Sequence, residues 1–502
     1  MSAAMEEDWH ANFYYAGQPT AINDDDGNGP TVELPSFLEL HSATRHYREM
    51  ADGIIKQLSM SHEVALRTEE IFGSSQSLSH HLEKKISKAA ELLEHNSFVL
   101  EDILKPFPVS AIEPATPNLV CKMGVESPAV ESSTDAIARY IPSFSAKNSN
   151  SDNVNEEQPY DEAVQIIAHL TRDWSKEGAI LREEFSWIEE QLWRYHYETI
   201  QSTESVVSPI LVPGAGIGRL AFDLAFAQDE ERSDDSFISY PFAVEAMDNS
   251  IVMAAAAHHM FHIHSNGNVT YDNIPSNQRQ TKIYPFVSDS LSNEVDTQRR
   301  WDYAQIPELS VMDQLRSMHD LHPHQRPRLS YTVGDFVTTY SSPSKHGQYG
   351  SLVSVFFIDT ATNIFEYVWT VRNALRHGGV WINFGPVQWH RNAQLHPTTN
   401  ELRDIIEAAG FEVKYWEVSE KLVAYRHPDD LDSTHSRERG SRSTRSEAYR
   451  PLKFVAILKA GDSSMDGQDE CLLSAIQKVR LSTGRRSIIN HVHPDFIGEP
   501  DE

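Results

Sequence analysis

The stretch that decides the fold runs Ile210-Leu211-Val212-Pro213-Gly214-Ala215-Gly216-Ile217-Gly218-Arg219-Leu220-Ala221-Phe222. Its first residues predict a buried strand, the three glycines predict a tight turn, and the apolar pattern that follows predicts a helix. Glycine takes positive φ angles and lets a ligand approach the backbone, and free N–H groups at a helix N-terminus favour an electron-rich ligand. The stretch therefore predicts a binding turn for a nucleotide-type cofactor.

The spacing of the glycines separates two classes of cofactor. Gly214, Gly216 and Gly218 form G-x-G-x-G, whereas a dinucleotide-binding turn has its third glycine one position later. The pattern is similar to the first motif of S-adenosylmethionine methyltransferases. A glycine-rich turn that binds no ligand is the alternative, and the rest of the chain has to decide between the two.

Length and charge limit the classes of protein that fit. The chain has 502 residues and a formal net charge of −30, and its length suits one large α/β domain with additions. A nucleic-acid-binding protein needs a clustered basic face, and so does a protein that docks on anionic membranes. We therefore expect a small neutral or cationic substrate, no nucleic acid and no membrane, and a homodimer stays open.

Cysteine content and the N-terminal residues bear on location. Cys121 and Cys471 are the only cysteines, which argues against a disulfide framework and against a thiolate zinc site. The acidic N-terminal residues lack the apolar segment of a secretory signal. We expect a soluble protein in the cytoplasm, with the nucleus as a further location.

The first part of the chain divides by composition into three regions. Residues 1–35 are rich in Asp, Asn, Gly and Pro and predict a disordered tail. Residues 36–105 show apolar positions at helical intervals, which predict two or three helices. Residues 106–159 are rich in Ser, Pro, Asn and Glu, a composition typical of a linker.

Residues 160–460 form the predicted cofactor domain. Two apolar helical patterns precede the glycine turn, and strands alternate with helices after it, which is typical of a doubly wound parallel sheet. Within the domain, 265–328 predict a lid or substrate insertion and 427–448 a flexible loop, and a polar tail follows at 461–502. The fold class is therefore α/β with an N-terminal helical extension. We expect strands at 210–213, 242–245, 352–358, 380–384, 411–418 and 454–458.

Acidic and aromatic residues at strand ends are expected to hold the cofactor. Glu245 ends the predicted second strand, where a carboxylate can accept both ribose hydroxyls, and Asp248 is a near alternative. Asp335 and Phe336 follow another strand, and there a carboxylate and an aromatic ring can bind adenine. Asp359 closes a later strand, at the edge where ligands bind in open α/β sheets. Each of these residues also has a plain structural interpretation as a solvated turn or strand end.

Three further motifs, together with the glycine turn, resemble the carnosine N-methyltransferase family. They are Arg172-Asp173-Trp174-Ser175, Phe356-Phe357-Ile358-Asp359-Thr360-Ala361 with Asn363, and Gly378-Gly379-Val380-Trp381-Ile382-Asn383-Phe384-Gly385-Pro386. The resemblance implies a mostly parallel, seven-stranded class I methyltransferase sheet of Rossmann-like type. It also implies transfer of a methyl group from S-adenosyl-L-methionine to the histidine imidazole of carnosine, which gives anserine.

The same resemblance implies roles at the substrate site. Asp359 would accept a hydrogen bond from the N–H of the substrate imidazole and stabilise the imidazolium that forms. His390 matches a family histidine that contacts the substrate and would share in catalysis. Tyr425 and Tyr449 would correspond to family tyrosines at the substrate site.

The resemblance implies further cofactor contacts from other parts of the chain. His169 and Arg172 would reach the cofactor from a helix that caps the domain, and Val355 would line its pocket. Family members commonly have Gln where this chain has His169. Val212 stands where an acid usually precedes the glycine turn, and Arg172 could replace that anchor by pairing with the methionyl carboxylate.

Two other patterns favour packing over chemistry, and two other functions stay open. Four histidines lie near one helix end, but no cysteine or ordered acidic pattern accompanies them, so we expect no metal site. Phe356 and Phe357 are expected to pack in the core. The open alternatives are a methyltransferase for histidine within proteins, with 265–328 holding an extended chain, and a non-catalytic scaffold that binds S-adenosylmethionine. The histidines are His258, His259, His262 and His264.

Overall fold

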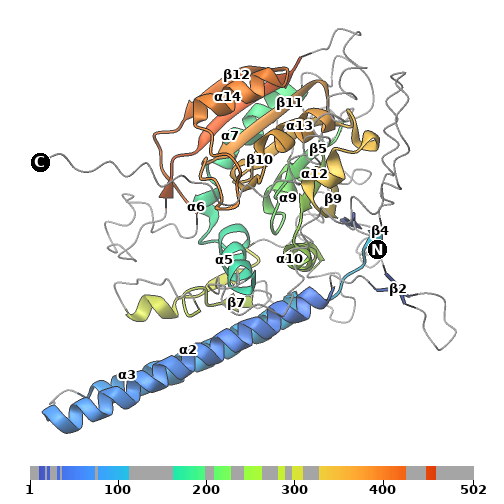
Figure 1. Cartoon of the computed structure of the whole chain (residues 1–502). Coiled ribbons are helices and arrows are strands. Elements are labelled where there is room, and N and C mark those ends of the chain that lie inside the picture. The colour runs from blue at the N-terminus through green and yellow to red at the C-terminus, as the bar shows by residue number, and fades with distance from the viewer. Residues whose placement is uncertain are drawn as a thin grey trace, which may run out of the picture. The chain divides into compact units, whose positions relative to one another are not determined.

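Alternating strands and helices form one nine-stranded sheet with helices on both faces (Figure 1). The computed structural model describes residues 11–16, 20–22, 31–33, 37–73, 77–111, 162–197, 208–227, 242–262, 281–288, 297–308, 327–425 and 448–459. In the sheet, β15 runs antiparallel to both of its neighbours, and all other neighbouring strands are parallel. The strand order is β12 (Phe411–Val418), β15 (Leu452–Leu458), β11 (Leu375–Gly385), β10 (Tyr349–Val355), β5 (Ile210–Pro213), β6 (Ala243–Asp248), β9 (Arg328–Val333), β1 (Asn12–Tyr15) and β4 (Ser110–Ala111).

The seven strands from β12 to β9 confirm the predicted doubly wound, mostly parallel class I methyltransferase sheet. Two further strands extend it, and both come from regions predicted to lack structure. β1 lies within 1–35, a region whose composition is polar on average. Its residue Phe13 is nevertheless 4% exposed and pairs in register with Tyr331 of β9. β4 lies within the predicted linker 106–159 and pairs with β1. The structure corrects both predictions at these strands.

Apolar residues cover both faces of the sheet because neighbouring residues of a strand point to opposite sides. Val212 and Val353 belong to one buried cluster, and Leu211 and Leu352 belong to the other. The first face packs against helices α2 (Phe37–Phe72), α3 (Leu78–Ile103), α5 (Glu162–Trp174), α9 (Arg219–Ala225) and α10 (Ile251–His262). The second face packs against α12 (Phe336–Tyr340), α13 (Ile364–Ala374) and α14 (Thr399–Ala408).

Helices α2 and α3 confirm the N-terminal helical extension and lie side by side (Figure 1). A small hairpin from the predicted insertion 265–328, formed by β7 (Thr281–Ile283) and β8 (Ala304–Ile306), rests on α3. Asn96 of α3 donates to the carbonyl of Tyr284 at 2.9 Å and accepts from its backbone N–H at 2.9 Å. The described part of the insertion is therefore packed against the N-terminal helices.

Short elements complete the described structure. They are the strands β2 (Thr20–Ile22), β3 (Thr31–Glu33), β13 (Val423–Ala424) and β14 (Ala448–Tyr449), and the helices α6 (Ala179–Arg182), α7 (Phe185–Gln191), η1 (Leu192–Tyr197), η4 (Thr297–Trp301), η5 (Pro343–Lys345) and η6 (Ile358–Thr360). Most of the predicted linker and of the loop 427–448, the tail 461–502, both cysteines and His264 lie outside the described residues.

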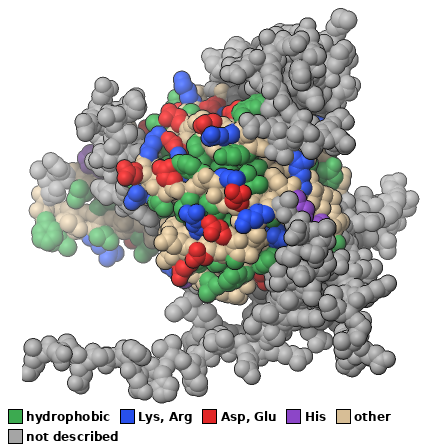
Figure 2. All heavy atoms as spheres, turned by 90° about the horizontal axis from the view of Figure 1, so that it is seen from above, with side chains coloured by type: hydrophobic (Ala, Val, Ile, Leu, Met, Phe, Trp, Pro, Cys, Tyr) green, Lys and Arg blue, Asp and Glu red, His purple; other side chains and the backbone are tan. Residues whose placement is uncertain are grey.

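The surface of the described part mixes charges of both signs. On the face that Figure 2 shows, Lys and Arg side chains lie among Asp and Glu side chains. None of the described helices is both long enough and apolar enough to cross a membrane.

Candidate functional site

The three glycines of the turn after β5 adopt left-handed conformations that other residues rarely take. Their φ angles are 66° at Gly214, 55° at Gly216 and 76° at Gly218. A Cβ atom at Gly218 would lie 2.7 Å from the ring of Phe261, so Gly218 lets α9 pack closely on α10 rather than facing open space. At Gly216 the nearest atom to a Cβ would be Nδ1 of His169, at 3.3 Å. The turn therefore places Gly216, and not Gly218, toward the residues of α5.

Asp248, the last residue of β6, holds the glycine turn from the neighbouring strand. Its Oδ2 accepts from the backbone N–H of Gly216 at 2.9 Å, and its Oδ1 accepts from that of Ser250 at 3.0 Å. Burial raises the pKa of Asp248, and these backbone donors act in the opposite direction. Tyr331 of β9 donates to the carbonyl of Gly216 at 2.5 Å. A carboxylate thus lies at the strand end beside the turn, where ribose hydroxyls bind in folds of this class.

Glu245, the first choice for that role, lies elsewhere. It is the third residue of β6, and the strand continues to Asp248. Its carboxylate accepts from Thr332 at 2.9 Å, from Tyr340 at 2.6 Å and from Tyr349 at 2.6 Å, and it pairs with Lys345 at 3.6 Å. The prediction that Glu245 ends this strand is therefore wrong, because the strand end was placed three residues too early, and the alternative Asp248 lies at that end.

Asp335 and Phe336 follow β9 as predicted, and they differ in exposure. The exposed Asp335 caps α12 by accepting from the backbone N–H of Thr338 at 2.7 Å. Phe336 is 3% exposed, and its ring packs edge-on against Phe357 at 5.2 Å and Tyr367 at 5.3 Å. Asp335 is exposed, whereas the Phe336 ring lies in the core, and the contact of Phe336 with adenine stays a prediction.

Helix α5 brings His169 and Arg172 to the glycine turn and to Tyr425. The guanidinium of Arg172 lies 4.9 Å from the centre of the Tyr425 ring and 3.4 Å from Nδ1 of His169. It also donates to both carboxylate oxygens of Asp173, at 2.7 Å and 3.0 Å. Burial opposes the charge of Arg172, but the Asp173 carboxylate outweighs it and raises the pKa of Arg172. Arg172 is therefore a permanently charged group beside the turn.

Phe356 directly follows Val355, the half-buried last residue of β10, and has the left-handed φ of 49°. Such a conformation is unfavourable for a side chain of this size and is found at functional sites. The ring of Phe356 lies 5.0 Å from the ring of Tyr425 and 6.3 Å from that of Tyr449. Phe356 packs against the core as expected, and its half-buried ring also contacts the two predicted substrate tyrosines.

Asp359 and His390 meet beyond the end of β10. Asp359 is 6% exposed, and its Oδ2 accepts from the backbone N–H of Gln388 at 3.1 Å. Burial raises the pKa of Asp359 to about 6, and no ion pair among the described residues neutralises it. The backbone N–H of His390 donates to the carbonyl of Asp359 at 3.1 Å, and the His390 side chain is exposed. The pair combines a buried carboxylate with an accessible imidazole.

The glycine turn and the Asp359 segment lie at one crevice of the sheet. The chain leaves β5 toward β6 and returns to β10 on the other side of β5, and ligands of open α/β sheets bind at such a switch point. The Phe357 ring packs on Gly214 and so connects the two segments. The acceptors Asp248 and Asp335, the cation Arg172 and the exposed Gly214 of the turn are of the kinds that bind the hydroxyl, amino and carboxylate groups of an adenosyl amino acid.

A model of the family described as carnosine N-methyltransferase matches residues 149–456, which is more than half of the chain. The chain belongs to the carnosine N-methyltransferase family. It is 28% identical over 266 residues to a carnosine N-methyltransferase of Dictyostelium discoideum, covering 51% of this chain and 49% of that protein. It is 27% identical over 263 residues to one of Schizosaccharomyces pombe, covering 49% and 61%. The chain thus spans about half the length of the curated relatives it matches.

Several solved structures with a similar chain path carry the name methyltransferase, but the similarity is weak. Magnesium protoporphyrin IX methyltransferase from Synechocystis, solved with bound S-adenosylhomocysteine, is 9% identical with a TM-score of 0.28, covering 62% of this chain and 90% of that one. A possible histamine N-methyltransferase from Thermotoga maritima is 13% identical with a TM-score of 0.24, covering 56% and 99%. The fold assignment accordingly rests on strand order.

Sequence reasoning missed the charged residues that hold this family site together. Asp173, Arg182, Arg219 and Glu308 form a largely buried network behind the glycine turn. Only the position of Asp173 beside Arg172 could have suggested a pair from the sequence, because Glu308 lies 126 residues from Arg182 and 89 from Arg219.

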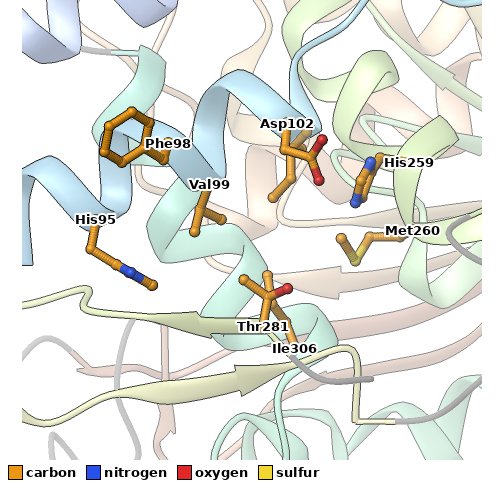
Figure 3. A pocket seen from close by; sticks show the side chains of 9 residues that line it. His95, Phe98, Val99, Asp102, His259, Met260, Thr281 and Ile306 are labelled. Atoms are coloured by element: carbon orange, nitrogen blue, oxygen red, sulfur yellow. The ribbon is translucent and has the colours of Figure 1, made fainter. Parts of the chain in front are cut away.

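A separate pocket lies between α3, α10, β7 and β8 (Figure 3), and none of its lining residues belongs to the predicted site. In the close-up, Asp102 of α3 lies across from His259 of α10, and Thr281 and Ile306 close the pocket from the hairpin. The lining residues are His95, Phe98, Val99, Asp102, Ile103, His259, Met260, Thr281 and Ile306.

Proposed function

We propose that the protein transfers a methyl group from S-adenosyl-L-methionine to an imidazole nitrogen of histidine in carnosine or a related small peptide. Family membership supports the reaction class. The observation that carries the proposal is Asp359, a buried carboxylate without an ion-pair partner among the described residues, in η6 beyond the end of β10, the strand that pairs with β5. Bound S-adenosylmethionine would supply an electrophilic methyl group at this crevice.

The residues of the chain would act on the imidazole as follows. A neutral imidazole attacks through one nitrogen, so its other nitrogen must carry the proton, and this N–H donates a hydrogen bond to an acceptor. Asp359 would be this acceptor, fixing the tautomer and stabilising the positive charge that the ring gains as the new N–C bond forms. Phe356, Tyr425 and Tyr449 would flank the ring, and His390 would contact the rest of the peptide.

On the cofactor side, Asp248 and Asp335 would accept from the ribose hydroxyls and the adenine amino group. Gly216 would allow the backbone to approach the cofactor, and Arg172 with His169 would face its amino-acid portion. Val355 would line the pocket at the end of β10. The hydrogen bond of Asp248 with Gly216 and the closeness of His169 to Gly216 support these roles.

Purified protein with methyl-labelled S-adenosylmethionine and carnosine tests the proposal. We expect labelled anserine, and we expect Asp359→Asn to lose at least 100-fold in turnover while still binding S-adenosylhomocysteine. Transfer to histidine in intact proteins but not to carnosine would favour the protein methyltransferase. Binding of S-adenosylhomocysteine without transfer to any histidine compound would contradict an enzyme and favour the scaffold.

A further inference from the structure

We propose that Glu308 is a positioning residue that holds helix α5, and with it His169 and Arg172, over the glycine turn. The inference rests on the proposed function, because it concerns binding of the same cofactor. Glu308 lies in the sequence insertion, two residues after β8, and no motif of the chain singles it out. Its contacts with the end of α5 and the start of α9 carry the argument.

The end of α5 is capped by side chains from elsewhere in the chain. A helix leaves its last carbonyl groups without partners inside the helix. Arg182 donates to the carbonyl groups of Arg172 and Ser175, and Arg219 donates to that of Asp173 at 2.8 Å. Two arginines thus take the capping role, and they fix the last turn of the helix that carries Arg172.

Glu308 completes this cap with both its backbone and its side chain. Its backbone N–H donates to the carbonyl of Trp174, the last residue of α5, at 2.7 Å. Its Oε1 accepts from Arg219 at 2.5 Å and from Arg182. One residue therefore contacts the helix end and both of the arginines that cap it.

The charge of Glu308 is what allows the two arginines to lie together. The Arg182 and Arg219 side chains are only 7% and 9% exposed. Burial and the charge of Arg219 both lower the pKa of Arg182. If the carboxylate were neutral, the two buried cations would repel each other, with Asp173, which already pairs with Arg172, and the more exposed Asp223 as the neighbouring anions. We therefore expect the capping contacts at the end of α5 to loosen.

A change at the end of α5 would directly alter the cofactor turn. Arg219 is the first residue of α9 and follows Gly218 of the turn. The indole N–H of Trp174 donates to the carbonyl of Ile217 at 3.2 Å, so α5 is also tied to the turn itself. His169 of α5 lies next to Gly216 of the turn, so a shift of the helix end would change the distance between these two residues.

The test compares wild-type protein with Glu308→Gln and with the matched control Glu184→Gln. Glu184 also bridges two cations, Lys421 and Lys453, but it contacts neither the end of α5 nor the turn. Calorimetric titration with S-adenosylhomocysteine measures the cofactor site. Hydrogen exchange of the Trp174 indole N–H reports how firmly the end of α5 is held when no ligand is bound. Its NMR signal is assigned by its loss in Trp174→Phe.

We expect Glu308→Gln to weaken S-adenosylhomocysteine binding at least tenfold and to expose the Trp174 indole proton to exchange. The affinity and the exchange rate of Glu184→Gln should both stay within twofold of the wild-type values. The inference would be overturned if Glu308→Gln had the same affinity for S-adenosylhomocysteine as wild-type protein, or the same protection of the Trp174 indole proton from exchange. If wild-type protein binds no S-adenosylhomocysteine, the proposed function fails, and the Trp174 proton alone decides the role of Glu308. Should Glu308→Gln not fold, Glu308→Asp keeps the charge but is too short to span both arginines, and it is expected to weaken binding by the same mechanism.

Discussion

Asp359 illustrates the stability cost of a functional group at the scale of one residue. Its pKa is about 6 in the folded protein against 3.8 for an ordinary Asp, because burial disfavours the charged form. Below about pH 4 the carboxyl is protonated in both folded and unfolded chains, so no cost arises. Above about pH 6 it is ionised in both, and the folded state bears a cost on the order of 3 kcal/mol.

We therefore predict that Asp359→Asn raises the free energy of unfolding by about 1–3 kcal/mol at pH 7.5 and changes it little near pH 4. Urea unfolding at the two pH values measures the difference. The wild-type methylation rate should also fall as the pH drops through about 6, since a protonated Asp359 cannot accept the imidazole N–H. A rate independent of Asp359 protonation would exclude it as the acceptor.

We predict opposite effects for substitutions of Asp248 and Glu245, although the two residues lie three positions apart on one strand. Asp248→Asn removes the charge beside Gly216 and is expected to weaken S-adenosylhomocysteine binding about tenfold or more. Glu245→Gln disturbs the contacts with Tyr340 and Tyr349 and is expected to lower the melting temperature without changing that affinity. Titration calorimetry and thermal unfolding of both variants separate the two effects. The reverse pattern would restore Glu245 as the ribose ligand.

The site residues that sequence predicted are those with a local signal. The glycines of the turn, Arg172 and Asp359 each lie in a short motif, and the glycine turn and the segment of Asp359 follow the neighbouring strands β5 and β10. The strand end after Glu245 was missed because Ala246 and Met247 give no periodic pattern that marks where a strand ends. Glu308 could not be found, since its partners are distant in sequence and only the fold brings them together.

At the scale of elements, Asn96 connects α3 with the β7–β8 hairpin. Its side chain is 1% exposed and pairs with both backbone groups of Tyr284. Asn96→Ala leaves the two backbone groups without this partner, so we predict a loss of about 1–3 kcal/mol in the free energy of unfolding. Urea unfolding measures it. His95→Ala removes an exposed hydrogen bond with the carbonyl of Lys282 and an edge contact with the Tyr284 ring; it leaves both backbone groups of Tyr284 paired, so it is the control and should cost less.

Two strands have the bounds that the sequence predicted. They are β5 in the middle of the sheet and β12 at its edge. β10 ends three residues earlier than its apolar run because Phe356 turns into the left-handed region. Hydrophobicity alone cannot show this, since the residues after the strand are as apolar as those within it.

At the scale of the whole molecule, β1 joins the N-terminal residues to the cofactor side of the sheet. The Phe13 ring stacks on that of Tyr331 at 5.3 Å, and the Tyr331 hydroxyl donates to Gly216. We predict that deleting residues 1–16 weakens S-adenosylhomocysteine binding and lowers the melting temperature by several degrees, whereas deleting 1–10 changes neither. Calorimetry on the two truncated proteins tests this. Equal affinity in both would show that the turn does not depend on β1.

The whole-molecule arrangement was the hardest to predict because it depends on contacts between distant segments. Composition marked residues 1–35 as a tail, yet the short run that contains Phe13 buries enough apolar surface against β9 to join the sheet. The average over a region conceals a strand of four residues.

The pairing of β1 with β9 also sets an order of events during synthesis. Asn12 lies opposite Ser330, so the strand that emerges first has to wait for more than 300 further residues before its partner exists. Until then Phe13 and the neighbouring tyrosines remain exposed on a nascent chain. The helices α2 and α3, which are close in sequence and pack on each other, can begin to form during this interval, and we expect closure of the sheet edge to be a late step in folding.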